Sequence, residues 1–335
     1  MVVVPAAKIA AGFSNEPFWA RARPERRSRR CHHVRRSTGV SGSSPCDRDP
    51  IVTCHGRRRH GIPARGTRAA SVRGVTYDDD LRLAHVLADA TAQITMSRFR
   101  ASDLVVESKP DLTLVSDADR AAEEYLRAQL RRARPRDAVL GEEFAPTGHG
   151  PRRWVLDPID GTHNYVRGVP VWATLIALLD GDDPVVGLVD APALGRRWWA
   201  AKGQGAYAGR SLTSAHPLRV SAVRDIAHAS ISISSVTSWS GVDRQEAMVD
   251  LLGSCWRDRA FGDFWSYMLL AEGAVDIAAE PELGLYDMAA LVPVVTEAGG
   301  RFTSLAGVDG CFGGNAVATN GLLHDEVLAR IGVSG

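Results

Sequence analysis

The pattern of apolar residues along this 335-residue chain predicts helices first and strands after them. Apolar side chains recur at near-helical spacing over residues 77–99, so the folded part is expected to begin with an amphipathic helix. A second helix is expected over residues 118–132, with Asp117 or Asp119 as its cap. Short apolar runs typical of buried strands follow at residues 138–141, 154–156, 171–179 and 185–189.

The C-terminal part repeats both patterns. Strands are expected at residues 229–235, 274–278, 301–303 and 316–318. Helices are expected at residues 243–255, 264–271, 287–298 and 320–330. Because helices and strands mix without strict alternation, the predicted fold is a layered α/β sandwich.

Charge divides the chain into two unlike parts. Residues 1–74 hold 16 Lys+Arg and 4 Asp+Glu, a net charge of +12, whereas residues 75–335 hold 24 and 35, a net charge of −11. The first part mixes arginine runs with Pro, Gly and Ser and has no sustained apolar pattern. It therefore cannot bury enough surface to offset its ordering entropy, and we expect it to be disordered.

The arginine-rich part has several interpretations. Only three basic residues of the chain are lysines, which is typical of GC-rich coding DNA, so the part could be upstream sequence read in frame. We then expect the true start near Val72 or Val75. A transit peptide is an alternative. Zinc binding is not favoured, because the Cys and His spacing matches no finger or ribbon, and nucleic-acid binding is not favoured, because such tails are more often only solvated.

Composition also restricts the cellular setting. No run approaches the ~20 apolar residues that span a bilayer, so no membrane association is expected. After residue 74 the chain has only Cys255 and Cys311, without a paired pattern, which favours a reducing cytoplasm.

The segment Asp157-Pro158-Ile159-Asp160 directly follows an apolar strand and is itself followed by Gly161 and Thr162. Two carboxylates three residues apart offer oxygen ligands for a divalent cation. A Gly-Thr turn that opens a helix offers backbone N–H groups to an anion. The alternative is a strand end whose Asp and Thr side chains only cap a turn and a helix.

More carboxylates stand at the ends of other predicted elements, namely Asp119, Glu142 and Asp287. Any one of them could be a cap, because a solvated carboxylate at the end of an element costs little. Together with Asp157 and Asp160, beside an anion-binding turn, they indicate a metal and phosphate site. Oxygen ligands without His or Cys favour Mg²⁺ or Mn²⁺ over zinc.

Three segments resemble the signature motifs of the inositol monophosphatase superfamily: Gly141–Glu143, Trp154–Thr162 and Tyr286–Ala290 with the following Thr296–Gly300. The resemblance covers about residues 77–331. It implies a sandwich of alternating α and β layers, as in fructose-1,6-bisphosphatases, and a Mg²⁺-dependent phosphomonoesterase. Tyr286 departs from the pattern, because the family usually has Trp there.

The resemblance also implies residue roles. Metal binding would fall to Glu142, Asp157, Asp160, Asp287 and the carbonyl of Ile159. Gly161 and Thr162 would bind phosphate, and Asp119 would serve a further, weaker metal. Glu142, Thr162 and Asp119 would be catalytic, with two or three Mg²⁺ ions per site, Mn²⁺ as a substitute, and a metal-activated water as nucleophile.

Other segments, chiefly Arg259–Tyr267 and Val166–Ala173, are similar to histidinol-phosphate phosphatases of the actinobacterial type. L-Histidinol phosphate carries an ammonium and an imidazole, so its pocket should present carboxylates beyond the metal ligands. Glu280 matches a substrate-contact position of the family. Asp263 is the additional candidate, and it could instead cap the helix that follows it.

The expected activity is therefore hydrolysis of L-histidinol phosphate to L-histidinol and phosphate, in histidine biosynthesis. An inositol-1-monophosphatase or a broader sugar-phosphate phosphatase is the alternative, and a catalytically silent metal-binding protein is the alternative of another class. A single domain is expected, with a metal and phosphate half at residues 75–215 and a substrate half at residues 216–335. The family resemblance implies a homodimer that acts on a small phosphomonoester.

Overall fold

The computed structural model describes residues 76–110 and 113–332. The predictions made for residues 1–74 lie outside these residues. Among the described residues, no helix carries an apolar stretch long enough to cross a bilayer.

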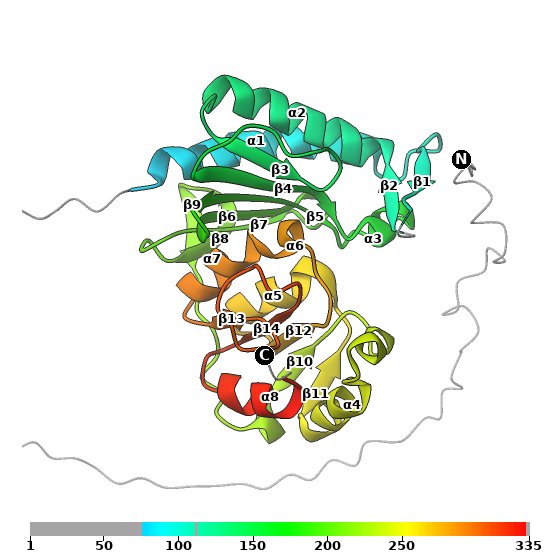
Figure 1. Cartoon of the computed structure of the whole chain (residues 1–335), viewed down its shortest axis with the longest axis vertical. Coiled ribbons are helices and arrows are strands. Elements are labelled where there is room, and N and C mark those ends of the chain that lie inside the picture. The colour runs from blue at the N-terminus through cyan, green and yellow to red at the C-terminus, as the bar shows by residue number, and fades with distance from the viewer. Residues whose placement is uncertain (1–75, 111–112, 333–335) are drawn as a thin grey trace, which may run out of the picture. The chain divides into compact units, whose positions relative to one another are not determined.

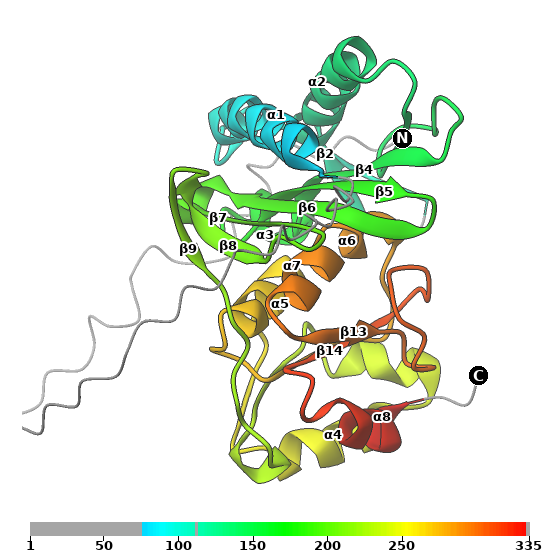
Figure 2. The same cartoon turned by 90° about the vertical axis from the view of Figure 1, so that its left-hand side faces the viewer.

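Helices and sheets alternate in layers (Figures 1 and 2). α1 (Asp78–Arg98) and α2 (Asp117–Ala133) cover the outer face of a seven-stranded sheet. Between that sheet and a five-stranded sheet lie α5 (Asp263–Ala271), α6 (Leu285–Met288) and α7 (Leu291–Glu297). The far side of the smaller sheet is covered by α4 (Gln245–Ser254) and α8 (His324–Ile331). The predicted layered α/β fold is confirmed.

The larger sheet has its strands side by side in chain order. β3 and β4 are parallel, and every later neighbour is antiparallel. Both faces of the central strands are buried under helices, which is why these strands read as continuous apolar runs. The strands are β3 (Ala138–Gly141), β4 (Arg152–Asp160), β5 (Ala173–Asp180), β6 (Asp183–Ala191), β7 (Arg196–Ala201), β8 (Ala206–Ser211) and β9 (Ser214–Pro217).

The smaller sheet is mixed, in the order β11, β10, β12, β14 and β13. The first three strands are parallel to one another, so their carboxyl ends meet at one edge. The strands are β10 (Ser230–Ser232), β11 (Arg257–Arg259), β12 (Ile277–Glu280), β13 (Arg301–Thr303) and β14 (Ala316–Thr319).

Shorter elements complete the described chain. A two-stranded hairpin of β1 (Val106–Ser108) and β2 (Leu114–Ser116) leads into α2. α3 (Thr162–Val166) follows β4 directly. Three single-turn or two-turn 3-10 helices are η3 (Pro192–Leu194), η4 (Ile226–His228) and η5 (Thr237–Val242).

The alternation of side chains along the strands builds two cores from one sheet. Trp154 and Trp199 point toward α1 and α2 and belong to the outer core. Val155 and Trp198, their neighbours in sequence, point the other way into the core that contains α5 and α7. β4 and β7 therefore pack against helices on both of their faces.

Several local predictions were wrong. Ser116, not Asp117 or Asp119, is the N-cap of α2, and Asp119 accepts a hydrogen bond from the Ser116 backbone in return. The expected helix at residues 287–298 is two helices, α6 and α7. The strand expected at residues 274–278 begins at Ile277 and runs to Glu280. Strands β1, β2, β7, β8, β9 and β11 were not predicted, because each is only three residues long or mixes arginine, glycine and other small or polar residues with the apolar ones.

Gly187 of β6 lets α7 approach the sheet closely. A Cβ atom there would lie 2.2 Å from the carbonyl oxygen of Ala290, at the junction of α6 and α7. Gly187→Ala should therefore lower the free energy of unfolding by about 1–3 kcal/mol, the usual cost of overpacking, as measured by chemical denaturation. Gly253→Ala is the control, because Gly253 lies in α4 with open space around it and should be neutral or stabilised by up to about 1 kcal/mol. Equal effects at both positions would contradict this packing argument.

Candidate active site

Asp157 and Asp160 both lie within β4, not in a turn after it. Asp157 pairs with Leu175 of β5 and Asp160 pairs with Ala173, so three steps on β4 match two steps on β5. One extra residue on β4 forms a β-bulge. Residues three apart on a regular strand point to opposite faces, and the bulge instead lets both carboxylates face the same side.

Two neighbours of the bulge explain why it is stable. Pro158 has no backbone N–H to contribute to the ladder, and a bulge tolerates that loss. Its carbonyl oxygen accepts a hydrogen bond of 2.8 Å from the hydroxyl of the buried Thr174. The Ile159 N–H donates to Asp157 Oδ1 at 3.0 Å, which fixes the carboxylate against its own strand.

Glu142 reaches the site because β3 is parallel to β4. Gly141 pairs with Leu156, so the next residues along each strand, Glu142 and Asp157, lie side by side. The corner after β3 is held by the buried Glu123 of α2, whose carboxylate accepts the backbone N–H of Glu143 at 2.7 Å. Glu123 was missed in the sequence, although its spacing of four residues from Arg127, with which it forms a buried ion pair, is a recognisable signal.

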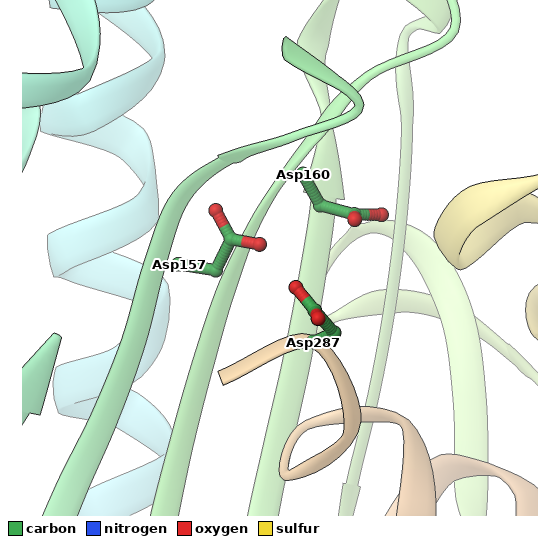
Figure 3. Close-up of side chains that lie close together, drawn as sticks. All are labelled: Asp157, Asp160 and Asp287. Carbon is green, nitrogen blue, oxygen red and sulfur yellow. The ribbon is translucent and has the colours of Figure 1, made fainter. Parts of the chain in front are cut away.

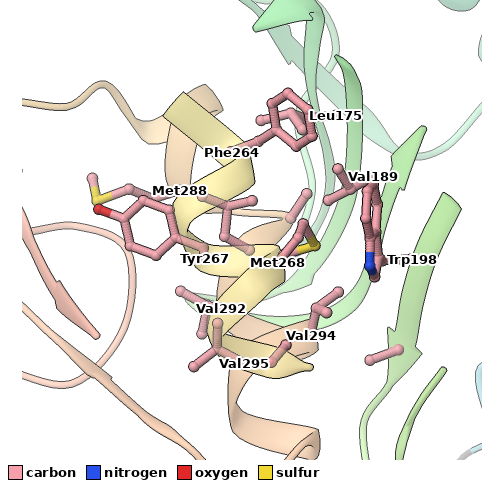
Figure 4. Packing of buried hydrophobic residues seen from close by; sticks show 14 of the residues in the cluster. Leu175, Val189, Trp198, Phe264, Tyr267, Met268, Met288, Val292, Val294 and Val295 are labelled. Carbon is pink, nitrogen blue, oxygen red and sulfur yellow. The ribbon is translucent and has the colours of Figure 1, made fainter. Parts of the chain in front are cut away.

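Asp287 comes from the layer below the sheet, where α6 packs against β4. Its Oδ2 accepts the Gly284 N–H at 2.6 Å, which caps α6 and fixes the side chain. The next residue, Met288, is buried and packs near Tyr267 of α5, so the short helix is anchored in the core (Figure 4).

Asp157, Asp160 and Asp287 converge from two layers (Figure 3). One oxygen atom from each of the three carboxylates lies within 4.8 Å of the others. Such a set of oxygen atoms can hold a divalent cation. Of the residues predicted as metal ligands, the structure brings these three together most closely, and Glu142 lines the same cleft.

Gly161 and Thr162 form the turn that follows β4. Gly161 has φ 84°, a left-handed conformation that favours glycine, and a Cβ atom there would lie 3.1 Å from the Val171 carbonyl oxygen. Thr162 opens α3, and its hydroxyl donates to the Ile159 carbonyl oxygen at 3.0 Å. The predicted anion-binding turn therefore has the expected backbone geometry.

Asp119 lies at the first turn of α2 and is fully buried. Its Oδ2 accepts hydrogen bonds from the Ser116 N–H at 2.8 Å and from the Ser116 hydroxyl at 2.5 Å. Its Oδ1 is 3.5 Å from the Thr162 hydroxyl oxygen. Asp119 therefore adjoins the turn after β4 through Thr162.

Burial and mutual repulsion act on the carboxylates of this cleft. Burial, together with the neighbouring Glu142, Asp160 and Asp287, raises the pKa of Asp157 well above its ordinary value. Burial and nearby carboxylates likewise raise the pKa of Asp160. The pKa of Asp287 and that of Asp119 both rise to about 7, chiefly because of burial. A cleft of this kind is strongly attractive to a cation.

Lys109 supplies a positive charge at the edge of this cleft and was not predicted. Its Nζ donates to Glu142 Oε1 at 2.7 Å and to Glu143 Oε1 at 2.8 Å. Burial opposes the charged form of Lys109, but the hydrogen bonds to the two glutamates raise its pKa overall. In the metal-free protein this lysine balances part of the negative charge.

Asp263 and Glu280 are the carboxylates predicted to contact substrate. Asp263 lines the cleft, and its Oδ2 accepts from Asn164 Nδ2 at 3.1 Å. The N-cap position of α5 is Gly262, and Asp263 is the first residue of the helix. Asp160 caps that helix instead, because its Oδ2 accepts the Phe264 N–H at 2.7 Å.

Glu280 lies at the end of β12 and is buried, and it is absent from the described residues that line the cleft. Its carboxylate accepts the Ser234 hydroxyl at 2.6 Å. Burial raises the pKa of Glu280 to about 7, with Asp263 and Asp287 contributing, and hydrogen bonds from Ser234 oppose the rise. Glu280 is therefore electrostatically close to both cleft residues.

The cleft itself has a volume of about 180 Å³. A larger cleft of about 580 Å³ lies beside the β5–β6 turn and α7, and none of the predicted site residues lines it. The chemistry of the lining residues, rather than cavity size, locates the candidate active site. His163 and Tyr286 also line the smaller cleft, and neither was predicted as a site residue.

Comparisons with known proteins agree with this geometry. Residues 77–331 match the model of the inositol monophosphatase family. The chain is 63% identical over 259 residues to a histidinol-phosphatase of Streptomyces coelicolor, covering 76% of this chain and 97% of that protein. It is 58% identical over 254 residues to a histidinol-phosphatase of Mycobacterium tuberculosis, covering 76% and 98%. The fold is similar to that of an inositol monophosphatase from Zymomonas mobilis, with a TM-score of 0.67 and 30% identity over 77% of this chain and 99% of that one.

The raised carboxylate pKa values predict how stability depends on pH. In the metal-free fold Asp157, Asp160 and Asp287 hold protons more tightly than the unfolded chain does. The unfolded chain loses these protons near pH 4, whereas the fold still holds them, so the free energy of unfolding should fall as pH rises from about 4 to about 7, the pKa of Asp287. Stabilisation by Mg²⁺ should grow over the same interval, because the cation binds the ionised carboxylates.

Thermal denaturation at pH 5.5 and pH 8, in chelator and in Mg²⁺ at matched ionic strength, measures both effects. Asp160→Asn should shrink the difference between the two pH values, because it removes one of the three titrating groups. A Mg²⁺ stabilisation that is equal at both pH values would contradict the expectation.

Proposed function

This chain belongs to the inositol monophosphatase family, and we propose that it hydrolyses L-histidinol phosphate to L-histidinol and inorganic phosphate. The family is metal-dependent, and the described cleft offers the oxygen ligands that such a metal needs. The two actinobacterial relatives named histidinol-phosphatase match this chain over nearly their whole length. Their similarity supports histidinol phosphate as the substrate, in histidine biosynthesis.

The observation that best supports phosphate-ester hydrolysis is that a candidate cation site and a candidate phosphate site lie in the same cleft. Carboxylate oxygens of Asp157, Asp160 and Asp287 lie within 4.8 Å of one another. The turn of Gly161 and Thr162 lines the same cleft and presents the N-terminus of α3, whose N–H groups suit a phosphate. A cation site beside an anion site is what hydrolysis of a phosphate ester requires.

We assign metal binding to Asp157, Asp160, Asp287 and Glu142, with the carbonyl of Ile159. When bound, Mg²⁺ polarises the phosphate ester and a water molecule. Oxygen ligands alone favour Mg²⁺, with Mn²⁺ as a substitute, and two or three ions would share the carboxylates.

The protein's own groups would orient the attacking water. The Thr162 hydroxyl can give its hydrogen to the Ile159 carbonyl oxygen or to Asp119 Oδ1, so its lone pairs are free to accept a hydrogen bond from water. Glu142 at the other side of the cleft would take up the proton of that water. Asp119 would keep Thr162 in place and serve the weaker metal. The N–H groups after Gly161 would hold the phosphate.

Asp263 supports a substrate with a cationic nitrogen. Its Oδ2 lies 3.3 Å from the position that a Cβ atom on Gly161 would take, so the carboxylate adjoins the phosphate turn. In histidinol phosphate the ammonium is two carbon atoms from the ester oxygen, so it would fall close to this carboxylate. Glu280, behind Asp263, would add negative charge for the imidazole.

Several properties of the assembly also belong to this proposal. The larger sheet and its helices would form the metal and phosphate half, at residues 75–215, and the smaller sheet the substrate half, at residues 216–335. A cytoplasmic homodimer is the form we expect of the enzyme, with no membrane or nucleic-acid partner.

An inositol-1-monophosphatase or a broader sugar-phosphate phosphatase is the second candidate, because the same metal and phosphate groups would serve it and the solved structure from Zymomonas mobilis is of that kind. A catalytically silent metal-binding protein is a weaker alternative, because the cleft is lined by Glu142, Asp157, Asp160 and Asp287 together with the phosphate turn of Gly161 and Thr162.

A substrate panel tests the choice of substrate. With Mg²⁺ present, kcat/KM for L-histidinol phosphate should exceed that for inositol 1-phosphate by at least about tenfold. The reason is that the uncharged inositol ring cannot form an ion pair with Asp263 or Glu280. Phosphate release measures both reactions. Faster turnover of inositol 1-phosphate would overturn the substrate, and growth rescue of a histidine auxotroph that lacks this phosphatase would give an independent test.

Asp160→Asn tests the metal site. The variant should lose Mg²⁺-dependent phosphate release by at least about a hundredfold, because an amide is a poor ligand and leaves the charge of the site unbalanced. Asp309→Asn is the matched control, since Asp309 is exposed and lines the larger cleft rather than this one, and the variant should keep wild-type turnover. Unchanged turnover of Asp160→Asn would refute the proposed ligand set.

A further inference from the structure

Three parallel strands of the smaller sheet bring distant parts of the chain to one edge. Ser232 of β10 pairs with Ala278 of β12, so two residues later Ser234 stands opposite Glu280. On the other side, β11 is parallel to β10 and leads into the turn before α5. Ser234 therefore lies between Glu280 and the turn that carries Asp263.

The Ser234 hydroxyl bonds to both neighbours. It donates to Glu280 Oε1 at 2.6 Å and accepts the Asp263 backbone N–H at 3.0 Å. The directions are fixed, because an amide N–H can only donate and the hydroxyl has a single hydrogen to give to the carboxylate. One oxygen atom thus links the Glu280 carboxylate to the backbone of Asp263, the two residues that the proposed function assigns to substrate recognition.

The turn at residues 262–263 needs such a tie. Gly262 has φ 73° and Asp263 has φ 48°, and the second value is unfavourable for a residue other than glycine. The Ser234 hydroxyl oxygen lies 3.1 Å from the position of a Cβ atom on Gly262, so it packs directly against the turn. The left-handed backbone at Asp263 aims its carboxylate at the Gly161 turn, where Asn164 Nδ2 also holds it.

We propose that Ser234 is a positioning residue for substrate selection, which clamps Glu280 and the Gly262–Asp263 turn so that both carboxylates serve one cationic substrate. The proposal rests on the proposed histidinol phosphatase activity. Ser234 acts through the two carboxylates and has no part in the metal or phosphate chemistry. Loss of the clamp should therefore weaken binding of a nitrogen-bearing ester and leave a neutral ester unaffected.

Steady-state kinetics with Mg²⁺ test this separation, with L-histidinol phosphate and glycerol 2-phosphate as the two esters. Ser234→Ala should raise KM for L-histidinol phosphate by about tenfold, the value of a hydrogen bond to a charged group, and change kcat by less than about twofold. KM for glycerol 2-phosphate should stay the same. Ser234→Thr keeps the hydroxyl and should restore the wild-type KM.

Ser235→Ala is the matched control, because the Ser235 hydroxyl bonds to Thr237 and takes no part in the clamp. Its kinetics should equal those of the wild type. An increase in KM for both esters, or an equal effect of Ser234→Ala and Ser235→Ala, would overturn the clamp.

A direct contact between Ser234 and the substrate is a different mechanism. A variant that lacks the carboxylates of both Asp263 and Glu280 separates the two mechanisms. In the background Asp263→Asn with Glu280→Met, Ser234→Ala should cause no further rise in KM if Ser234 acts through those residues. A further tenfold rise would overturn the positioning role. The wild-type measurements test the proposed function by themselves, because a wild-type preference for glycerol 2-phosphate would overturn the proposed activity. If the wild type prefers L-histidinol phosphate and Ser234→Ala has the same KM as the wild type, the clamp alone is overturned.

Discussion

Repulsion between buried carboxylates is the constraint on which the rest of this structure depends. Asp157, Asp160 and Asp287 come within 4.8 Å of one another, and burial raises the pKa of each. Such a group is unfavourable for folding, so each side chain is fixed by backbone donors: the Ile159 N–H, the Phe264 N–H and the Gly284 N–H. The favourable burial of apolar residues in the layers on either side has to outweigh the remaining cost.

The layered architecture provides this apolar burial, because the carboxylates lie near the ends of helices and strands and the apolar residues lie in their interiors. Trp154 and Val155, three and two residues before Asp157, are buried on opposite faces of β4. The β-bulge then turns Asp157 and Asp160 to the same side without breaking the strand. Within one strand, the residues that stabilise the fold are thus followed directly by the residues of the candidate site.

Much of this arrangement could be predicted from the sequence, and the remainder has physical reasons. The long helices α1 and α2 and the central strands carry strong apolar periodicity, and the carboxylates that follow them mark the site. The bulge in β4 was not predictable, because its signal is a mismatch in the pairing with β5, which is seen only when the two strands are paired. Lys109 and Glu123 were missed for a similar reason: a charged residue looks solvent-exposed until its partners, Glu142 and the Glu143 backbone, are brought to it by the fold. The break between α6 and α7 falls at Ala289 and Ala290, and Pro293 has no N–H to donate to the carbonyl of Ala289, four residues before it.

Asp160 has a double attachment with a mechanical consequence. It belongs to the larger sheet, yet its Oδ2 holds the first turn of α5, a helix of the layer beneath. Asp287 faces it from that same layer. An ion held between these two carboxylates would therefore lie across the boundary between the sheet and the helices. The space open to such an ion would depend on how the two layers pack together as well as on the ligands themselves.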